Sequence, residues 1–277
     1  MTIRVVTDTA ADLPESVRVE FGISVVPLTI RFGEEEFLDQ ATLTTDAFWD
    51  RVRTATQLPE TAAPSVGQFE SVFKGLRDEG ATGIICVSLS GNLSATMQSA
   101  VLAAKSFDDG FPIRVVDSTN VSLGQAMLVR RCAELIQLGH DIDSVCGDLE
   151  RARERTELFG LLDTLEFLHK GGRIGGAKKL LGSMLSIKPI IKTENGAVNE
   201  AGKVRTRAKG IAFLLEQLEG KALDSVGVLH GQASDVDELV ARVTEATGLT
   251  PMVNCLGPVV GTHTGPGSIG VTFIASE

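Results

Sequence analysis

The sequence predicts an α/β protein of two domains, with a parallel sheet in residues 1–155, an α+β domain with a mixed sheet in residues 156–277, and a ligand between them. In the first half, short apolar runs alternate with helical patterns and end in polar loops, which is typical of a parallel sheet. After about Arg155 this alternation changes. There Asn195-Gly196 is a strong two-residue hairpin signal, so the strands on either side are expected to be antiparallel.

The expected strands of the first half are apolar runs bounded by turn residues. They are residues 3–7, 24–30, 36–38, 84–87 and 113–116. Helices are expected between them, and their starts are marked by side chains that accept hydrogen bonds from free N–H groups. Asp12 with Glu15, and Ser65 with Gln68, have the spacing of capping boxes. Thr44 is expected to open a further helix.

The second half is less regular. Strands are expected at residues 158–162, from residue 187, after residue 197, at residues 225–229 and twice in the last segment, with helices at residues 206–218 and 234–247. A Gly-broken helical stretch is expected from residue 165. His263 is expected in a Gly/Pro/Thr loop between the last two strands, where glycines allow close backbone approach.

Composition excludes several classes of function. The 277 residues carry a formal net charge of −10, which argues against nucleic acid as a partner because phosphate contacts need clustered Lys and Arg. The four cysteines form no CxxC pair, and the sequence shows no cluster of metal ligands. No signal region or membrane-spanning run is present, so a cytoplasmic protein with reduced thiols is expected, with no metal and no cofactor.

The most informative stretch is residues 82–104, a buried strand followed by a Ser/Gly/Asn loop and an apolar helix. Met97, Val101 and Leu102 are expected on one side of this helix. Its free N–H groups and the Ser94 hydroxyl predict a seat for an anionic head group. Thr61 lies in an extended segment before another helix, and the two hydroxyls are expected to converge at the strand ends. Ordinary helix capping is the alternative for both.

Other candidate residues are weaker. His263 is the best of the four histidines for a polar ligand contact, whereas the others lie at helix ends or in an ordinary loop. The KGGRIGG segment around Arg173 lacks the spacing of a phosphate loop. A structural role is favoured for this arginine, with pairing to a ligand or partner anion as the alternative. Asp8 and Asp117 lie at strand ends. Capping is expected for both, because there is one Asp in each loop, and cation binding is the alternative.

Eight segments in order resemble the DegV family, the fatty-acid-binding subunits of bacterial fatty acid kinase. They are VTDTAADLP, TAAPS, SLSGNLSATMQSA, VVDSTNVSLG, LEFLHKGGRI, LGSMLSIKPII, GKVRTRAKG and LGPVVGTHTGPGSIGV, and they cover essentially the whole chain. The resemblance implies two α/β domains with one long-chain fatty acid buried between them. It also implies that Thr61, Ser94 and His263 hold the carboxylate.

Two motifs depart from the family pattern. The TSQPS-type motif is TAAPS here, so Ala62 and Ala63 replace polar residues near the head group. The LSGTY-type motif is LSATM, with Ala95 in place of Gly and with Met97, a more adaptable side chain, in place of Tyr. These changes bear on which acyl chain is preferred.

The resemblance implies a carrier and not an enzyme acting alone. A separate ATP-dependent kinase subunit would phosphorylate the bound carboxylate, with Arg173 and Arg205 as candidates for docking it, and transient membrane contact is compatible with this role. The alternative is a stand-alone acyl hydrolase using Ser94 and His263, although the nucleophile elbow GxSxG is absent. A small-metabolite sensor or transport module is a third interpretation.

Overall fold

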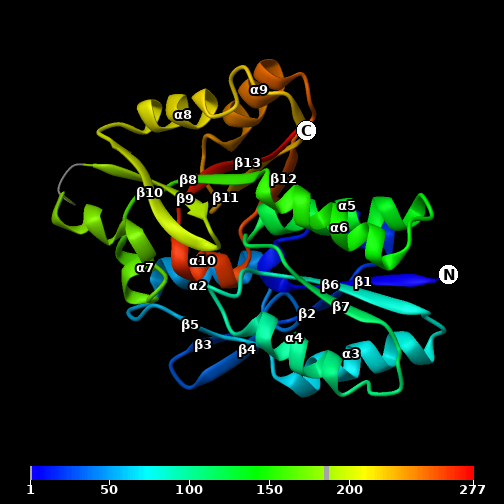
Figure 1. Cartoon of the computed structure of the whole chain (residues 1–277). Helices are drawn as coiled ribbons and strands as arrows, with labels where there is room; N and C mark the ends of the chain where they lie inside the picture. The colour runs from blue at the N-terminus through cyan, green and yellow to red at the C-terminus, as the bar shows by residue number, and fades with distance from the viewer. Residues whose placement is uncertain (1, 184–186) are drawn as a thin grey trace.

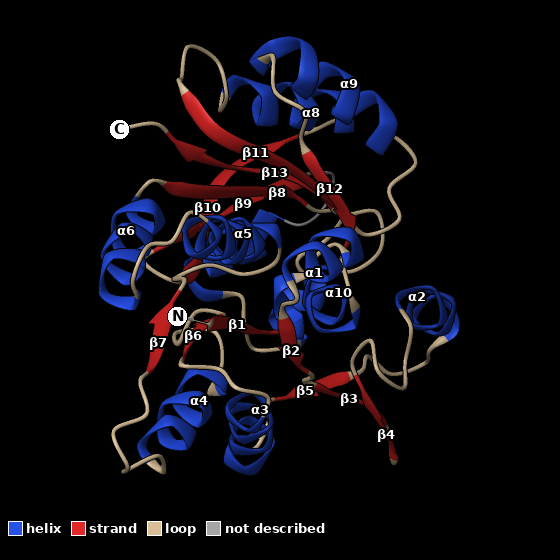
Figure 2. Cartoon of the chain, turned by 90° about the vertical axis from the view of Figure 1, so that its right-hand side faces the viewer, coloured by secondary structure: helices blue, strands red, loops and turns tan. Residues whose placement is uncertain are grey.

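The computed structural model describes residues 2–183 and 187–277, in which three sheets alternate with layers of helices (Figures 1 and 2). The first sheet is parallel throughout, in the order β2-β1-β6-β7. Its strands are β1 Ile3–Asp8, β2 Ser24–Val26, β6 Gly83–Ser88 and β7 Ile113–Asp117. All four strands end at the same edge, where the polar loops follow.

The second sheet has six strands in the order β10-β9-β8-β13-β11-β12 and is mixed, since only β11 and β12 are parallel. Its strands are β8 Thr156–Leu161, β9 Lys188–Glu194, β10 Ala197–Val204, β11 Leu223–His230, β12 Met252–Cys255 and β13 Ile269–Ala275. The predicted hairpin is confirmed: β9 and β10 are antiparallel, and Asn195 and Gly196 both have positive φ. The predicted fold class is therefore confirmed.

A third, three-stranded antiparallel sheet was not predicted. It has the order β4-β3-β5, with β3 Thr29–Phe32, β4 Glu35–Leu38 and β5 Glu60–Ala62. The single strand expected over residues 24–30 is wrong because the run divides between two sheets. Pro27 has no N–H to donate to a ladder, and the next N–H, of Leu28, is bonded to the Thr9 hydroxyl at 3.1 Å.

Ten α-helices and two 3₁₀-helices lie within the described ranges. They are η1 Thr9–Ala11, α1 Glu15–Phe21, α2 Thr45–Thr54, α3 Val66–Asp78, α4 Thr96–Lys105, α5 Leu123–Gln137, α6 Ile142–Glu154, α7 Glu166–Lys170, η2 Gly175–Ser183, α8 Arg207–Glu216, α9 Val236–Thr247 and α10 Pro258–Thr264. Helices α8 and α9 cover the outer face of the six-stranded sheet, and α3 and α4 cover the outer face of the parallel sheet (Figure 2). Helix α5 lies between the two sheets and contacts both.

Several local predictions are confirmed and others are wrong. Ser65 and Gln68 form the complete capping box of α3. Asp12 does not cap α1, which has Pro14 at that position; its side chain instead reaches Ser122 and Gly257. Residues 184–186 of the expected Gly-broken stretch lie outside the described residues.

The expected apolar face of α4 is also wrong. Helix α4 buries Thr96, Ala100 and Ala103, whereas the Leu102 residue is 44% exposed. Small residues face inward because α3 packs directly on α4. The largest hydrophobic cluster contains residues from both halves of the chain, including Leu128 of α5, Leu158 of β8 and Val259 of α10. The two halves therefore share one core.

Candidate functional site

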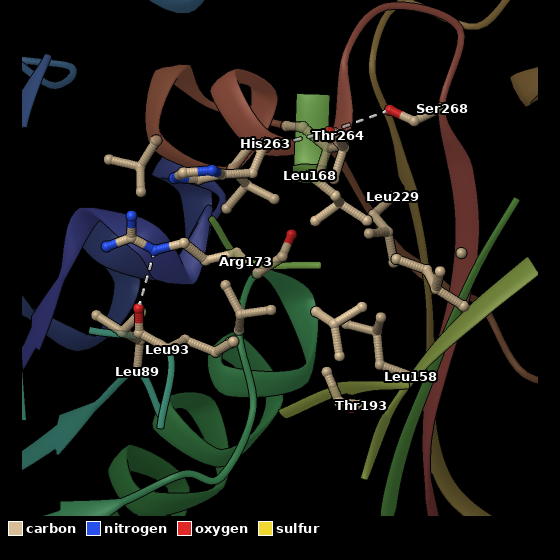
Figure 3. Close-up of a pocket in the computed structure, with 18 of the residues that line it drawn as sticks. Leu89, Leu93, Leu158, Leu168, Arg173, Thr193, Leu229, His263, Thr264 and Ser268 are labelled. Carbon is tan, nitrogen blue, oxygen red and sulfur yellow. Dashed lines mark hydrogen bonds between the residues drawn. The ribbon is translucent and has the colours of Figure 1, made fainter. Parts of the chain in front are cut away.

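A cavity lies between the inner face of the six-stranded sheet, α10 and the loop after β6 (Figure 3). It contains about 870 Å³ of space free of protein atoms, part of it open to solvent. Most of its wall is aliphatic. The aliphatic lining residues are Leu28, Leu89, Leu93, Val121, Leu158, Leu162, Leu168, Ile191, Val198, Leu229, Leu256, Val259, Val260 and Ile269. Such a wall favours a ligand with a long apolar body.

Thr61 and His263 meet at one end of the cavity. The Thr61 hydroxyl oxygen lies 3.0 Å from the Nε2 atom of His263. Thr61 is on β5, paired with Ile30 of β3, and α10 packs against both strands. His263 lies in the last turn of α10 and not in a loop, so the sequence prediction for its backbone is wrong. Pro258 at the first position of α10 explains the helix, because its fixed φ suits a helix start.

Ser94 lines the same cavity but bonds its own loop. Its hydroxyl oxygen lies 2.9 Å from that of Thr96 and accepts a hydrogen bond from the Thr96 N–H at 3.3 Å. Ser94 is therefore not the N-cap of α4, which is Ala95, but it bonds the first residue of that helix and lines the cavity. Met97 is not among the cavity-lining residues, so the adaptable wall expected from it is not found.

Arg173 also lines the cavity beside His263 (Figure 3). It donates from Nη1 to the Gly171 carbonyl at 2.8 Å and from Nε to the Leu93 carbonyl at 3.3 Å. The structural role favoured from the sequence is therefore present, and the same guanidinium places a positive charge at the polar end. This charge is what the alternative interpretation of Arg173, pairing with a ligand or partner anion, requires. Arg205 is exposed, between β10 and α8, and does not line the cavity.

Burial, together with the neighbouring Arg173 cation, lowers the pKa of His263 to about 4. The imidazole is therefore neutral at neutral pH. The cation beside this imidazole is Arg173. Gly171 permits this packing, since a Cβ there would lie 2.3 Å from Nδ1 of the ring.

The hydrogen bonds of His263 indicate its tautomer. Nδ1 is buried and has no hydrogen-bond partner among the described residues, whereas Nε2 faces the Thr61 hydroxyl. A buried N–H without a partner costs more than a buried lone pair without one. We therefore assign the proton to Nε2, which donates to the Thr61 oxygen. The Thr61 O–H is then free to donate to a ligand.

A second, surface cleft meets the cavity at this polar end. It is lined by residues 55–61 with Glu166, Lys170, Gly171, Arg173, Thr262 and His263. Three of these residues, Thr61, Arg173 and His263, line both spaces.

The described residues do not assemble a hydrolytic or metal site at this junction. His263 faces Thr61 and not Ser94, and no carboxylate accepts from its Nδ1. A nucleophile, a base and an orienting carboxylate are therefore not aligned. No group of three or more His, Cys, Asp or Glu residues in the described ranges is placed to hold a metal ion.

The geometry agrees with what known proteins show. Residues 2–276 match the DegV family, described as a family of uncharacterised proteins. A DegV domain-containing protein of Halalkalibacterium halodurans is 34% identical over 277 residues, covering 98% of each chain. A solved DegV family protein from Thermus thermophilus, described by its fatty acid binding, is 34% identical and has a TM-score of 0.90, with all of both chains covered.

A second solved structure, of DegV from Bacillus subtilis, is described as a fatty acid binding protein. It is 28% identical, has a TM-score of 0.89 and covers all of both chains. The similarity spans the parallel sheet, the mixed sheet and the loops that form the cavity between them, and it does not depend on one motif. This chain belongs to the DegV family.

Proposed function

We propose that this chain binds one long-chain fatty acid and presents its carboxylate to a separate, ATP-dependent kinase subunit, which converts it to an acyl phosphate. The observation that carries the proposal is the aliphatic cavity lined at one side by Thr61, Arg173 and His263, which also line a surface cleft. The fatty acid binding described for the Thermus thermophilus and Bacillus subtilis relatives supports the same ligand class.

The tail would supply most of the affinity. Each methylene removed from water contributes about 0.8 kcal/mol, so a sixteen-carbon tail contributes roughly 10 kcal/mol before ordering costs. The aliphatic side chains of the cavity wall, among them Leu89 and Leu229, would contact such a tail. The interactions with the head group then serve mainly to orient it, because the tail supplies most of the affinity.

The carboxylate would lie where Thr61, Ser94 and Arg173 line the cavity. The Thr61 hydroxyl, with its oxygen occupied by His263, is free to donate to it, and the Ser94 hydroxyl is a second donor. Hydrogen bonds to a charged group contribute about 1.5–3 kcal/mol each. Arg173 favours the ionised acid, which is the nucleophilic form.

In the reaction, one carboxylate oxygen would attack the γ-phosphorus of ATP, and ADP would leave with the electron pair of the broken P–O bond. The kinase subunit would supply ATP and its metal through the surface cleft beside Lys170 and Glu166. This chain's own contribution would be position and the exclusion of water from the acyl part of the product.

The charge of one segment of the chain favours an anionic partner surface. Residues 170–209 hold ten of the chain's 26 Lys and Arg but only two of its 36 Asp and Glu. This segment includes Arg173 at the cleft and the exposed Arg205. We propose it as the docking region for the kinase, and the same charge would permit transient contact with an anionic membrane. No helix in the described ranges is both long and apolar enough to cross a membrane.

The alternative of a stand-alone acyl hydrolase is less well supported. It needs Ser94 hydrogen-bonded to His263, whereas the imidazole faces Thr61. Purified chain without a partner is expected to cleave no acyl ester at a rate above buffer. Ester cleavage abolished by Ser94→Ala would favour the hydrolase instead.

Native mass spectrometry of the protein as purified tests the ligand directly. We expect one adduct of fatty-acyl mass per chain, lost on organic extraction and restored by adding palmitate. Adding a fatty acid kinase subunit with ATP and Mg²⁺ should then produce acyl phosphate, trapped as the hydroxamate. A water-soluble metabolite in place of the lipid would favour a sensor or transport module.

A further inference from the structure

Three aspartates are buried together where the two halves of the chain meet, away from the polar end of the cavity. The exposed fractions of Asp8, Asp12 and Asp39 are 1%, 1% and 0%. They come from the end of β1, from the turn after η1, and from the segment between β4 and α2. Buried carboxylates normally have a cationic or strongly hydrogen-bonding partner, because burial disfavours the charge.

Asp8 is well satisfied. Its carboxylate accepts from the N–H groups of Ala10 and Leu89, the Ser88 hydroxyl and the Gln125 amide, at 2.9–3.2 Å. These donors offset part of the cost of burial, which still raises the pKa of Asp8 to about 6.

Asp12 joins three elements. Its carboxylate accepts from the Ser122 hydroxyl, just before α5, at 2.6 Å and from the Gly257 N–H, just before α10, at 2.8 Å. Its backbone carbonyl accepts from the Asn254 side chain at 2.6 Å. Asp12 has a left-handed backbone with φ of 47°, so this arrangement is held by its tertiary contacts. Burial raises its pKa to about 7.

Asp39 differs from both, because neither of its carboxylate oxygens accepts a hydrogen bond of normal geometry from the described residues. The Thr9 hydroxyl and the Val259 N–H lie near it and offset only part of the cost of its burial. It lines a cavity that it shares with Asp8 and Gln40. A Cβ on Gly257 would lie 2.8 Å from Asp12 Oδ1 and 3.9 Å from Asp39 Oδ1, so the two carboxylates are within about 7 Å of each other. Burial, reinforced by the Asp12 charge, holds the pKa of Asp39 well above its usual range.

No side-chain cation in the described ranges pairs with this cluster. At the rim of its cavity, Arg18 is engaged by Glu15 at 2.5 Å. The other titratable neighbours are Cys86, which faces Asp8, and Cys255, which faces Asp12, and burial raises the pKa of both thiols. The spacing of His, Cys, Asp and Glu in the described ranges provides no three-ligand metal site. A proton is then the remaining means of neutralising the excess charge.

We propose that Asp12 and Asp39 form a proton-linked latch between the two halves of the chain, in which the pair holds at least one proton while the Gly257 loop is closed on it. Closing the loop takes up this proton, and opening or unfolding releases it. The latch adjoins the ligand cavity, because Ser122 and Val259 line that cavity while Ser122 and Gly257 bond Asp12. Alkaline pH therefore favours opening of the wall formed by the start of α10. The latch does not depend on which ligand the cavity holds.

The test compares the full chain with Asp39→Asn, which keeps the shape of the side chain and removes its titration. Thermal unfolding is followed from pH 5 to pH 8.5, with exposed Asp108→Asn as the matched control. We expect Asp39→Asn to melt about 3 °C or more above wild type at pH 8, with the difference shrinking toward pH 5, and Asp108→Asn to follow wild type. Equal pH slopes for wild type and Asp39→Asn overturn the proposal.

Proton counting gives a second readout that does not require a stabilised variant. Unfolding at pH 7.5, measured in weakly buffered solution, should release about one proton more from wild type than from Asp39→Asn. If Asp39→Asn does not fold, Asp12→Asn is measured in its place. Its folding stability is likewise expected to fall less than that of wild type as the pH rises. Equal proton release refutes the latch.

A cation in the cluster is the competing explanation. Wild type is therefore also melted in Na⁺, K⁺, Mg²⁺ or Ca²⁺ chloride against tetramethylammonium chloride at equal ionic strength. The latch predicts no difference among these salts. Cation-specific stabilisation that Asp39→Asn abolishes would assign the cluster to a cation and overturn the proton.

Discussion

Two buried polar clusters in this molecule respond to burial in opposite ways. At the polar end of the cavity, His263 gives up its proton, and a neutral imidazole faces Thr61. In the aspartate cluster, burial raises the pKa of Asp12 and Asp39, so protons are retained. The outcome is the same, since both sites reduce their charge, but the proton moves in opposite directions.

This difference determines the direction in which each cluster changes the folding stability as the pH changes. His263 has a folded pKa of about 4, below its ordinary 6.5, so its contribution is lost as pH falls from 6.5 toward 4. Asp12 has a folded pKa of about 7, above its ordinary 3.8, so its contribution is lost as pH rises from 4 toward 7. The two effects oppose each other between pH 4 and 6.5, and only the aspartates act above that window.

Thr61→Val should give the largest effect, because it removes the hydroxyl while keeping the shape of the side chain. We expect kinase-dependent acyl phosphate formation to fall by about 10- to 100-fold, the loss of one hydrogen bond to a charged group. Retention of the lipid in native mass spectrometry should be unchanged. Exposed Thr250→Val is the control. Normal turnover by Thr61→Val would contradict the assignment of the head group.

Trp49→Phe tests whether a hydrogen bond that attaches the start of α10 contributes to stability independently of the titrating aspartates. The indole N–H donates to the Leu256 carbonyl at 2.9 Å, beside the loop that Asp12 holds. Losing this buried bond should lower the free energy of unfolding by about 1–3 kcal/mol, measured by urea denaturation. The loss should be the same at pH 5.5 and pH 8, because no titrating group is removed. A loss of unfolding free energy at only one of the two pH values would show that this hydrogen bond is itself linked to a titrating group.

His263→Gln should flatten the acid side of the stability profile. Glutamine retains a donor for the Thr61 oxygen but does not titrate, so the fall in stability from pH 6.5 to pH 4 should be smaller than in wild type. Thermal unfolding across that range measures it. Asp39→Asn should leave the fall in stability at acid pH unchanged and reduce the fall at alkaline pH. A variant that changes the pH dependence on both sides would show that the two clusters are coupled.

Arg173→Met should have the smallest effect on stability and a specific effect on His263. Removing the cation should raise the pKa of the imidazole toward its ordinary value, while burial continues to hold it below that value. The C2–H resonance of His263 in an NMR titration reports this shift. No movement of the titration would show that burial alone accounts for the neutral imidazole.

Much of the fold follows from contacts between residues close in sequence. The capping box of Ser65 and Gln68 and the hairpin at Asn195-Gly196 are formed within two or three residues, so local rules identify them. The same rules failed for Asp12, whose partners Ser122 and Gly257 are 110 and 245 residues away. A side chain that suits a helix cap also suits a distant hydroxyl and N–H, and local sequence does not distinguish them.

By itself, the sequence determined the α/β class, the hydroxyls of Thr61 and Ser94 as candidate donors and, through the DegV resemblance, the expected place of His263. Only the tertiary structure decided that Thr61 and His263, 202 residues apart, are in contact, that Arg173 supplies the charge there, and that three aspartates share one buried cluster. The physical reason is burial. Whether a histidine or an aspartate carries its charge depends on the solvent and the neighbours that folding leaves around it.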